Sequence, residues 1–183
     1  ATTETGYLDG MPLAMLCGRA HRDAVDEQLA MEMLDEAAAL HAGGRDFDRR
    51  ERESLLASAV RVVEGAELRD RGPAEALAPA LDTLAGARRA TLGLDADEAP
   101  PAHLHVDLDV LDPTAAPGVT FPTPGGPSAG QLLQVIDLVR ERFALVAVTV
   151  TSFTPDRDDE AGTTLAAGLA VLQRVTTELV GRP

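Results

Sequence analysis

The sequence predicts an α/β fold, because stretches with the pattern of strands alternate with stretches that favour helices. Polar and apolar side chains alternate over residues 103–109, as they do in a strand with two different faces. An apolar run over residues 144–151 is typical of a strand buried in a parallel sheet. Between them, Ser128 is a helix-capping residue, followed by apolar residues at helical spacing to about residue 143. We therefore expect a three-layer α/β/α domain with a mainly parallel sheet.

The other elements are predicted from helix formers, caps and breakers. Gly72-Pro73 is a helix start signal, and Asp48 with Glu51 three residues later has the pattern of a capping box. Expected helices therefore cover residues 10–18, 23–35, 72–85 and 162–180, with a further helix that begins at Asp48. Short strands are expected at residues 38–42 and 60–63, and a polar connection at residues 88–101.

Composition restricts the class of protein. The net charge of −14 argues against nucleic acid or an anionic membrane as a partner. The 183 residues suffice for one domain, which we expect to cover residues 1–183. No apolar stretch reaches the length of a membrane span, and the lone Cys17 fits a reducing compartment, so we expect a cytoplasmic protein. All 16 basic residues are arginine, which favours a bacterium with a GC-rich genome as the source.

The most informative stretch holds three aspartates within six residues, Asp107, Asp109 and Asp112. Asp107 and Asp109 are two residues apart in the predicted strand, so their side chains are expected to share a face. Two carboxylates directed at one place repel each other unless a cation lies between them. A hard divalent metal such as Mn²⁺ or Mg²⁺ suits such a pair. Asp112 precedes Pro113 and is expected to shape a turn.

Around these aspartates the sequence resembles the ureohydrolase family, which includes arginase, agmatinase and formiminoglutamase. The matching residues are Asp107-Leu-Asp109-Val-Leu-Asp112-Pro113 and two later turns, Pro117-Gly118 and Pro124-Gly125-Gly126. Residues 3–18, 43–51 and 147–158 resemble three further segments of the family in the same order. The family's Gly-Gly-Asp-His and Asp-Ala-His-x-Asp segments are expected to precede residue 1. The resemblance thus implies an N-terminally incomplete domain that lacks its first strands and equals roughly the C-terminal two-thirds of a ureohydrolase.

The resemblance implies a Mn²⁺-dependent hydrolase that cleaves a C–N bond in a linear amidine. In this family a metal-bound hydroxide attacks a guanidino or formimino carbon, with two Mn²⁺ ions per subunit of the complete protein. By position, Asp107 and Asp109 match metal ligands, and Asp109 belongs to the catalytic centre. Asp9 stands where arginases place a histidine that shuttles protons, so it is a candidate proton relay. The resemblance also implies a small-molecule substrate and a homo-oligomer, either a trimer or a hexamer.

The same resemblance names residues that contact the substrate. Asp48 and Glu51 match acidic contacts to a substrate ammonium, although a capping box explains their spacing equally well. Thr5 and Tyr7 match contacts to the carboxylate end of a substrate. These residues would hold the end of the substrate that does not react.

Ser152 departs from the family, because it stands where a guanidinium-binding glutamate is expected. A buried guanidinium prefers a bidentate carboxylate, which a hydroxyl cannot supply. Arginine is therefore a doubtful substrate, unless Asp156 or Asp158 takes the place of that glutamate. Another amidine or imine is the alternative substrate.

Two other classes of function stay open. One is a non-catalytic ureohydrolase-like scaffold or small-molecule binding protein. The other is a metal-binding module of different descent that uses the aspartate pair for a nucleotide-sugar. His41, His103 and His105 are expected to be structural strand residues rather than metal ligands. Arg45 and Asp46 are expected to form an ion pair that orders their loop. If the first strands are missing, an open sheet edge predicts poor solubility of this chain alone.

Overall fold

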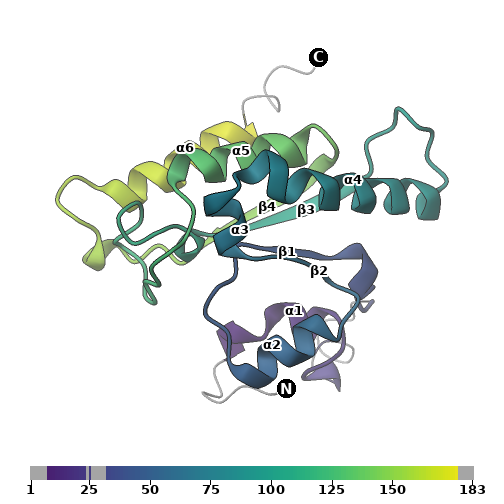
Figure 1. Ribbon diagram of the computed structural model, residues 1–183, viewed down its shortest axis with the longest axis horizontal. Coiled ribbons are helices and arrows are strands. Elements are labelled where there is room, and N and C mark those ends of the chain that lie inside the picture. Colours follow the sequence, from purple (N-terminus) through teal and green to yellow (C-terminus); the bar gives the residue numbers. More distant parts are fainter. Residues whose placement is uncertain (1–7, 24, 26–31, 177–183) are drawn as a thin grey trace. The chain divides into compact units, whose positions relative to one another are not determined.

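The computed structural model describes residues 8–23, 25 and 32–176, and the chain divides into two compact units. The first unit comprises residues 1–41 and 46–62, and the second comprises residues 42–45 and 63–183. Figure 1 shows the described elements as ribbons, coloured along the sequence from purple at the N-terminal end to yellow at the C-terminal end. The expectation of a single domain over residues 1–183 stays a prediction.

The first unit contains short helical elements. They are the 3₁₀ helices η1 (Leu8–Gly10) and η3 (Glu36–Ala38) and the α-helices α1 (Pro12–Leu16) and α2 (Arg49–Leu56). Proline in the first turn starts α1, as its fixed φ suits that position. Arg19 forms a bidentate ion pair with the carboxylate of Glu36. The same carboxylate accepts a hydrogen bond from the Ala59 N–H at 3.0 Å. Glu36 therefore joins three stretches of this unit.

The helix predicted over residues 23–35 is wrong at its C-terminal end. Residues 32–35 are not helical, and residues 24 and 26–31 lie outside the described part of the chain. Asp35 is extended, and its side chain accepts a hydrogen bond from the Ala37 N–H at 3.0 Å. An aspartate that binds the backbone two residues ahead competes with helix formation, so it starts η3 instead.

The two short strands are confirmed. β1 (Leu40–Ala42) and β2 (Arg61–Val63) form a two-stranded sheet. After β1, Gly43 has a φ of 93° and donates from its N–H to the carbonyl of Val63 at 2.8 Å. A glycine adopts this left-handed conformation without steric cost, so the chain can turn directly after the strand.

The second unit is built on a parallel pair of strands, β3 (Pro101–Asp107) and β4 (Ala144–Thr151). The register places Val106 beside Val150 and Asp107 beside Thr151. Apolar residues of one face pack in a core with the two helices that follow the strands. Its buried members are Val106, Leu108, Leu111, Ala116, Val119, Leu132, Ile136, Ala167, Val171 and Val175. The strands predicted at residues 103–109 and 144–151 are confirmed, and they pair in parallel, as the expected mainly parallel sheet requires.

Among the described residues of the second unit there are four α-helices, α3 (Gly65–Asp70), α4 (Pro73–Leu92), α5 (Ala129–Arg140) and α6 (Thr163–Thr176). Figure 1 shows α5 and α6 lying along the strand pair. Ser128 caps α5 as predicted, in a capping box with Gln131. α4 runs past residue 85 to a left-handed Gly93, because Arg88, Arg89 and their neighbours are good helix formers. The predicted connection at residues 88–101 is therefore shorter than expected.

The opposite face of the strand pair is open in the described chain. The register skips Val146, whose side chain is 69% exposed, so the expectation of a strand buried on both sides is wrong here. On this face His103 Nε2 lies 2.8 Å from the hydroxyl of Thr149, and His105 Nε2 lies 2.9 Å from that of Thr151. The two histidines are thus hydrogen-bonded within the strand pair, as expected, and a structural rather than metal-binding role stays a prediction.

Among the described helices, including the 20-residue α4, none combines the length and the hydropathy of a membrane span.

Candidate metal and substrate site

Asp107 and Asp109 lie together where β3 ends, in a segment that we call the aspartate turn (residues 107–112). The strand stops at Asp107, and a 3₁₀ turn, η4 (Leu108–Val110), follows. The prediction that the strand includes Asp109 is therefore wrong. The physical reason is that the Asp107 carboxylate accepts a hydrogen bond from the Asp109 N–H at 3.0 Å and turns the chain.

The two carboxyl groups still interact after this turn. Burial, the negative charge of Asp107 and a hydrogen bond with Asp107 raise the pKa of Asp109 to about 7, while the charge of Arg45 opposes that rise. The raised pKa means that a negative charge on Asp109 is unfavourable beside Asp107, and that a cation bound between them would stabilise both carboxylates.

Arg45 holds the aspartate turn through its backbone. Its guanidinium donates to the carbonyl oxygens of Asp109 at 2.8 Å and of Val110 and Leu111 at 3.0 Å each. It also donates to the carbonyl of Thr123 from Nη2 at 2.5 Å and from Nε at 3.0 Å. The ion pair expected between Arg45 and Asp46 stays a prediction.

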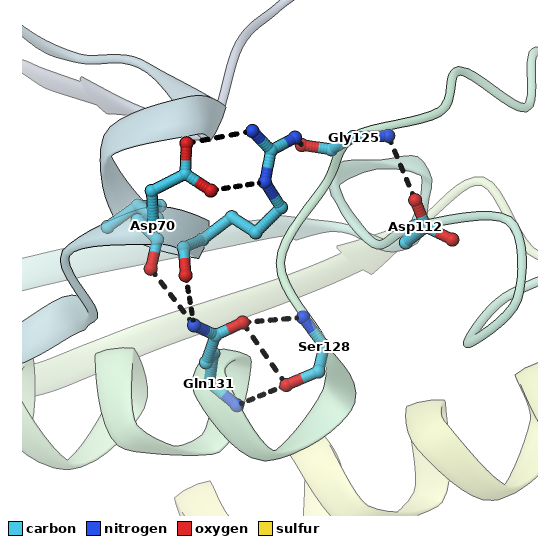
Figure 2. Close-up of polar contacts among 7 residues, drawn as sticks. Asp70, Asp112, Gly125, Ser128 and Gln131 are labelled. Carbon is cyan, nitrogen blue, oxygen red and sulfur yellow. Dashed lines mark hydrogen bonds and ion pairs between the residues drawn. The ribbon is translucent and has the colours of Figure 1, made fainter.

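Asp112 is a turn-former, as expected. Its carboxylate accepts hydrogen bonds from the Thr114 hydroxyl at 2.7 Å, the Thr114 N–H at 3.1 Å and the Gly125 N–H at 2.9 Å. These bonds lower the pKa of Asp112. Figure 2 shows Gly125 held from both sides, since its carbonyl accepts a hydrogen bond from Arg69 of α3 at 2.9 Å. The Pro124-Gly125-Gly126 turn is thus tied both to the aspartate turn and to a helix.

Two glycines of the matched motifs allow backbone segments to touch. A Cβ on Gly126 would lie 2.4 Å from the Val110 carbonyl oxygen and 2.6 Å from the Asp112 nitrogen. A Cβ on Gly118 would lie 2.9 Å from the Cα of Asp158. Only glycine permits such close approach, so the Pro-Gly turns pack directly against the aspartate turn and the loop after β4.

Ser152 directly follows β4, one residue beyond the Thr151 that pairs with Asp107. The structure therefore places Ser152 at the same edge of the sheet as the aspartates, as predicted. Its φ is 67°, a left-handed value that is unusual for a residue with a side chain. The loop beyond it is tied to the Pro117-Gly118 turn, because the Thr154 N–H donates to the Gly118 carbonyl at 2.8 Å.

Asp158 has a structural role in this loop. Its carboxylate accepts hydrogen bonds from the N–H groups of Thr164 and Leu165 at 3.0 Å each and so caps the first turn of α6. A carboxylate used in this way is not available to replace a guanidinium-binding glutamate. Asp156, in the 3₁₀ helix η5 (Pro155–Arg157), stays a candidate.

The residues predicted to bind the unreactive end of a substrate belong to the first unit. Asp48 and Glu51 form the capping box of α2, with the Asp48 N–H donating to Glu51 at 3.2 Å. Burial raises the pKa of Glu51, while that hydrogen bond lowers it. Asp9 lies in η1, and Thr5 and Tyr7 lie outside the described residues. The capping role of Asp48 and Glu51 is confirmed. Contact with a substrate stays a prediction for Asp48, Glu51, Thr5 and Tyr7.

The donor set at the aspartate turn suits a divalent metal but is incomplete. Carboxylate oxygens are the ligands that Mn²⁺ and Mg²⁺ prefer, and Asp107 and Asp109 supply them side by side. Within residues 8–23, 25 and 32–176, however, no three histidine, cysteine, aspartate or glutamate side chains are grouped so that they could hold a metal ion. Further ligands would have to come from outside these residues.

Sequence reasoning missed the contacts of Arg45 and of α3. Arg45 reaches acceptors that are 64 to 78 residues away in the sequence, which no local pattern reveals. The Gly-Gly pair before it was the available signal, because glycines mark a place where backbones come close. For α3 the signal was the spacing of Glu64 and Glu67, which form a capping box.

Comparisons with known proteins identify the family of this chain. The sequence model described as Arginase family matches residues 1–177. N(omega)-hydroxy-L-arginine amidinohydrolase from Streptomyces lavendulae is 32% identical over 160 residues, covering 87% of this chain and 48% of that protein. Arginase from Bacillus subtilis (strain 168) is 26% identical over 165 residues, covering 89% of this chain and 52% of that protein. The chain therefore spans about half the length of the curated relatives it matches.

Solved structures show the same fold. The crystal structure of arginase from Bacillus subtilis subsp. subtilis str. 168 superposes with a TM-score of 0.79 at 25% sequence identity. The match covers 94% of this chain and 56% of that one. The native arginase of Bacillus caldovelox gives a TM-score of 0.79 at 22% identity, over 94% of this chain and 54% of that one. The α/β class and the ureohydrolase resemblance are thus confirmed, and the chain belongs to the arginase family.

Proposed function

We propose that this chain carries part of the active site of a metal-dependent hydrolase that cleaves a C–N bond in a linear amidine. The observation that carries the proposal is the pair of interacting carboxylates, Asp107 and Asp109, at the carboxyl end of a parallel strand. Ligand sites of α/β proteins lie at this edge of the sheet. Membership of the arginase family supports the reaction class.

Asp107 and Asp109 would be metal ligands, with Mn²⁺ as the proposed ion and two ions in the complete site. When bound, such metals lower the pKa of a water molecule and polarise the amidine carbon that this water attacks. The side chains of this chain hold the ions and orient the substrate. The carboxylate of Asp9, where arginases carry a histidine, would accept and release the proton that the reaction transfers.

The proposed substrate is an amidine that does not need a bidentate carboxylate at residue 152. Ser152 presents one hydroxyl at this edge of the sheet, so it would make a single hydrogen bond to the reacting group. Asp48 and Glu51 would hold an ammonium, and Thr5 and Tyr7 a carboxylate, at the other end of the molecule. One relative that this chain resembles is named N(omega)-hydroxy-L-arginine amidinohydrolase, so N-hydroxyarginine is one amidine to test.

The assembly proposed for the active protein is a homo-oligomer, a trimer or a hexamer, in the bacterial cytoplasm. We propose a small molecule as its ligand, with neither nucleic acid nor a membrane as partner. The net charge of −14 supports this choice, because anionic partners would be repelled.

A second candidate function is a non-catalytic scaffold or small-molecule binding protein. Two observations favour it. Ser152 replaces the expected glutamate, and the described residues group no three potential metal ligands. Such a protein would bind a small molecule through the proposed substrate contacts but would not hydrolyse it.

The two candidates are separated by measuring Mn²⁺ binding and amidine hydrolysis on the same samples. Electron paramagnetic resonance of free Mn²⁺ gives the affinity, and mass spectrometry follows arginine, agmatine, N-hydroxyarginine and formiminoglutamate. The variants are Asp107→Asn and Asp109→Asn, with Asp97→Asn as the control because Asp97 is exposed on a loop.

For an enzyme, the wild type turns over at least one amidine, and Asp109→Asn lowers kcat/KM by about 100-fold or more while Asp97→Asn does not. If the wild type binds an amidine without hydrolysing any, the scaffold function holds instead. If Mn²⁺ binding is equal in the wild type and in both active-site variants, the metal assignment is wrong.

A further inference from the structure

Arg45 joins backbone segments that come from distant parts of the sequence. Three of its acceptors are successive carbonyls of the aspartate turn, those of Asp109, Val110 and Leu111, at 2.8, 3.0 and 3.0 Å. A fourth is the carbonyl of Thr123, just before the Pro124-Gly125-Gly126 turn. One side chain thus connects the segment that carries Asp109 to the turn that packs on it.

Three successive carbonyls that converge on one point need hydrogen-bond donors between them. Their oxygen atoms carry partial negative charge and would repel each other if nothing bridged them. The guanidinium of Arg45 bridges them, because its five N–H donors are fixed in one plane and reach several acceptors at once. A lysine ammonium keeps the charge but has three donors around one atom, so it cannot reach the same set.

The start of α3 contacts both the side chain of Arg45 and the backbone that precedes it. The Gly65 N–H, at the start of α3, donates to the carbonyl of Gly44 at 3.0 Å. A Cβ on Gly65 would lie 2.8 Å from the carbonyl oxygen of Gly43 and 3.4 Å from Cδ of Arg45. The stem of Arg45 therefore rests against a glycine that leaves room for it, and the guanidinium projects from a fixed base.

We propose that Arg45 is a positioning residue that presets the aspartate turn to receive a divalent cation. It acts through main-chain carbonyls, so that Asp107 and Asp109 converge before any metal arrives. The metal part of the proposal rests on the function proposed above. The effect on the aspartate turn does not, because it concerns the protein without metal.

The first experiment measures the turn without metal. Amide hydrogen exchange is followed by mass spectrometry in the full chain and in Arg45→Met, Arg45→Lys and Arg69→Met. Arg69 is the matched control, because it donates to the carbonyl of Gly125 but to none of the three carbonyls of the aspartate turn. We expect exchange over residues 108–112 to rise about tenfold or more in Arg45→Met, less in Arg45→Lys, and not in Arg69→Met.

The second experiment measures Mn²⁺ affinity by electron paramagnetic resonance on the same four proteins. Circular dichroism confirms that each is folded at the temperature used. Loss of a group that orients a metal ligand typically weakens affinity by about 10- to 100-fold. We expect that loss in Arg45→Met, partial recovery in Arg45→Lys, and the wild-type affinity in Arg69→Met.

Each result decides one part of the proposal. Unchanged exchange over residues 108–112 in Arg45→Met overturns the positioning role, whatever the metal affinity. Raised exchange with unchanged Mn²⁺ affinity overturns the link to the metal. If the wild type binds no Mn²⁺, the metal part fails together with the proposed function, and the exchange data alone decide whether Arg45 holds the turn. If Arg45→Met does not fold, Arg45→Lys provides the comparison.

Discussion

The hydroxyl of Thr164 accepts a hydrogen bond from the N–H of Gly118 at 2.7 Å, and Thr164 is fully buried at 0% exposure. The bond joins the first turn of α6 to the Pro117-Gly118 turn, 46 residues earlier in the sequence. It shows how a helix outside the aspartate motif helps to hold the loops around it.

Thr164→Val is expected to destabilise the protein, because valine has nearly the same shape but leaves the Gly118 N–H buried without an acceptor. Such an unsatisfied donor costs about 1–3 kcal/mol in the free energy of unfolding. Urea denaturation followed by circular dichroism measures it. Thr91→Val is the control, since Thr91 is exposed on α4 and should change stability by less than about 0.5 kcal/mol. Equal effects of the two substitutions would contradict the role assigned to Thr164.

Gly126→Ala is expected to lower stability, because its Cβ would collide with backbone atoms of Val110 and Asp112 that cannot move independently. We expect a loss of about 1–3 kcal/mol in the free energy of unfolding. Gly86→Ala is a control of opposite sign. Gly86 lies inside α4 with no atom within 4 Å of the added Cβ, so alanine should stabilise by about 0.5–1 kcal/mol. A stable Gly126→Ala protein would show that the two segments do not touch.

His41 is expected to make stability depend on pH. In the described part of the chain its Nδ1 is buried without a hydrogen-bond partner, and its ring lies 5.8 Å from that of Phe47. Burial lowers the pKa of His41 below the unfolded value of 6.5. Above pH 6.5 the His41 ring is neutral in both the folded and the unfolded state. Below pH 6.5 the ring binds a proton in the unfolded state but stays neutral in the folded state. Stability therefore falls as pH drops below 6.5, by up to about 1.4 kcal/mol per pH unit.

The His41 effect is measured as the difference between wild type and His41→Leu in urea denaturation from pH 8 to pH 5. The substitution itself changes stability at every pH, so only the slope is compared. We expect a shallower slope for His41→Leu below pH 6.5. Identical slopes would mean that His41 does not contribute.

The left-handed backbone of Ser152 predicts which residues this position tolerates. At a φ of 67°, glycine should be neutral or stabilising, whereas the branched side chain of valine should cost about 1–2 kcal/mol. Thermal unfolding of Ser152→Gly and Ser152→Val tests this order. A valine variant as stable as the wild type would argue against the strained conformation.

Ser152 is also a test of substrate choice. If Ser152 contacts the reacting group, Ser152→Glu should strengthen binding of arginine by about 10- to 100-fold, since a carboxylate can pair with a guanidinium through two charged hydrogen bonds. Isothermal titration with arginine measures the Kd. Ser152→Gln is the control, because it has the same shape without the charge. No gain in either variant would place Ser152 away from the substrate.

Local patterns predicted much of this structure, and long-range contacts account for what they missed. The capping residues Ser128 and Asp48 were sufficient to locate α5 and α2, because a cap is a contact within one turn. Alternation from His103 to Asp109 located β3 but not its end, since the hydrogen bond from Asp109 to Asp107 interrupts the strand. The exposure of Val146 depends on what covers the sheet, which no strand pattern contains.

In the candidate site, too, the sequence predicted what depends on the strands and missed what depends on long-range contacts. Asp107, Asp109 and Ser152 lie at one edge of the sheet because β3 and β4 are parallel, and a mainly parallel sheet was expected from the sequence. The carbonyl contacts of Arg45 were not foreseen, because they depend on how loops fold over one another. These contacts form only when the loops have folded, so neither Arg45 nor its neighbouring glycines reveal them as a local sequence pattern.

The close contacts of Gly126 are made with main-chain atoms alone, whereas those of Gly118 include the side chain of Asp158. Side chains on the outer surface of the Pro124-Gly125-Gly126 turn can then be exchanged during evolution without disturbing its packing on the aspartate turn. Surface residues of this region could therefore vary one at a time while the arrangement of its backbone stayed constant.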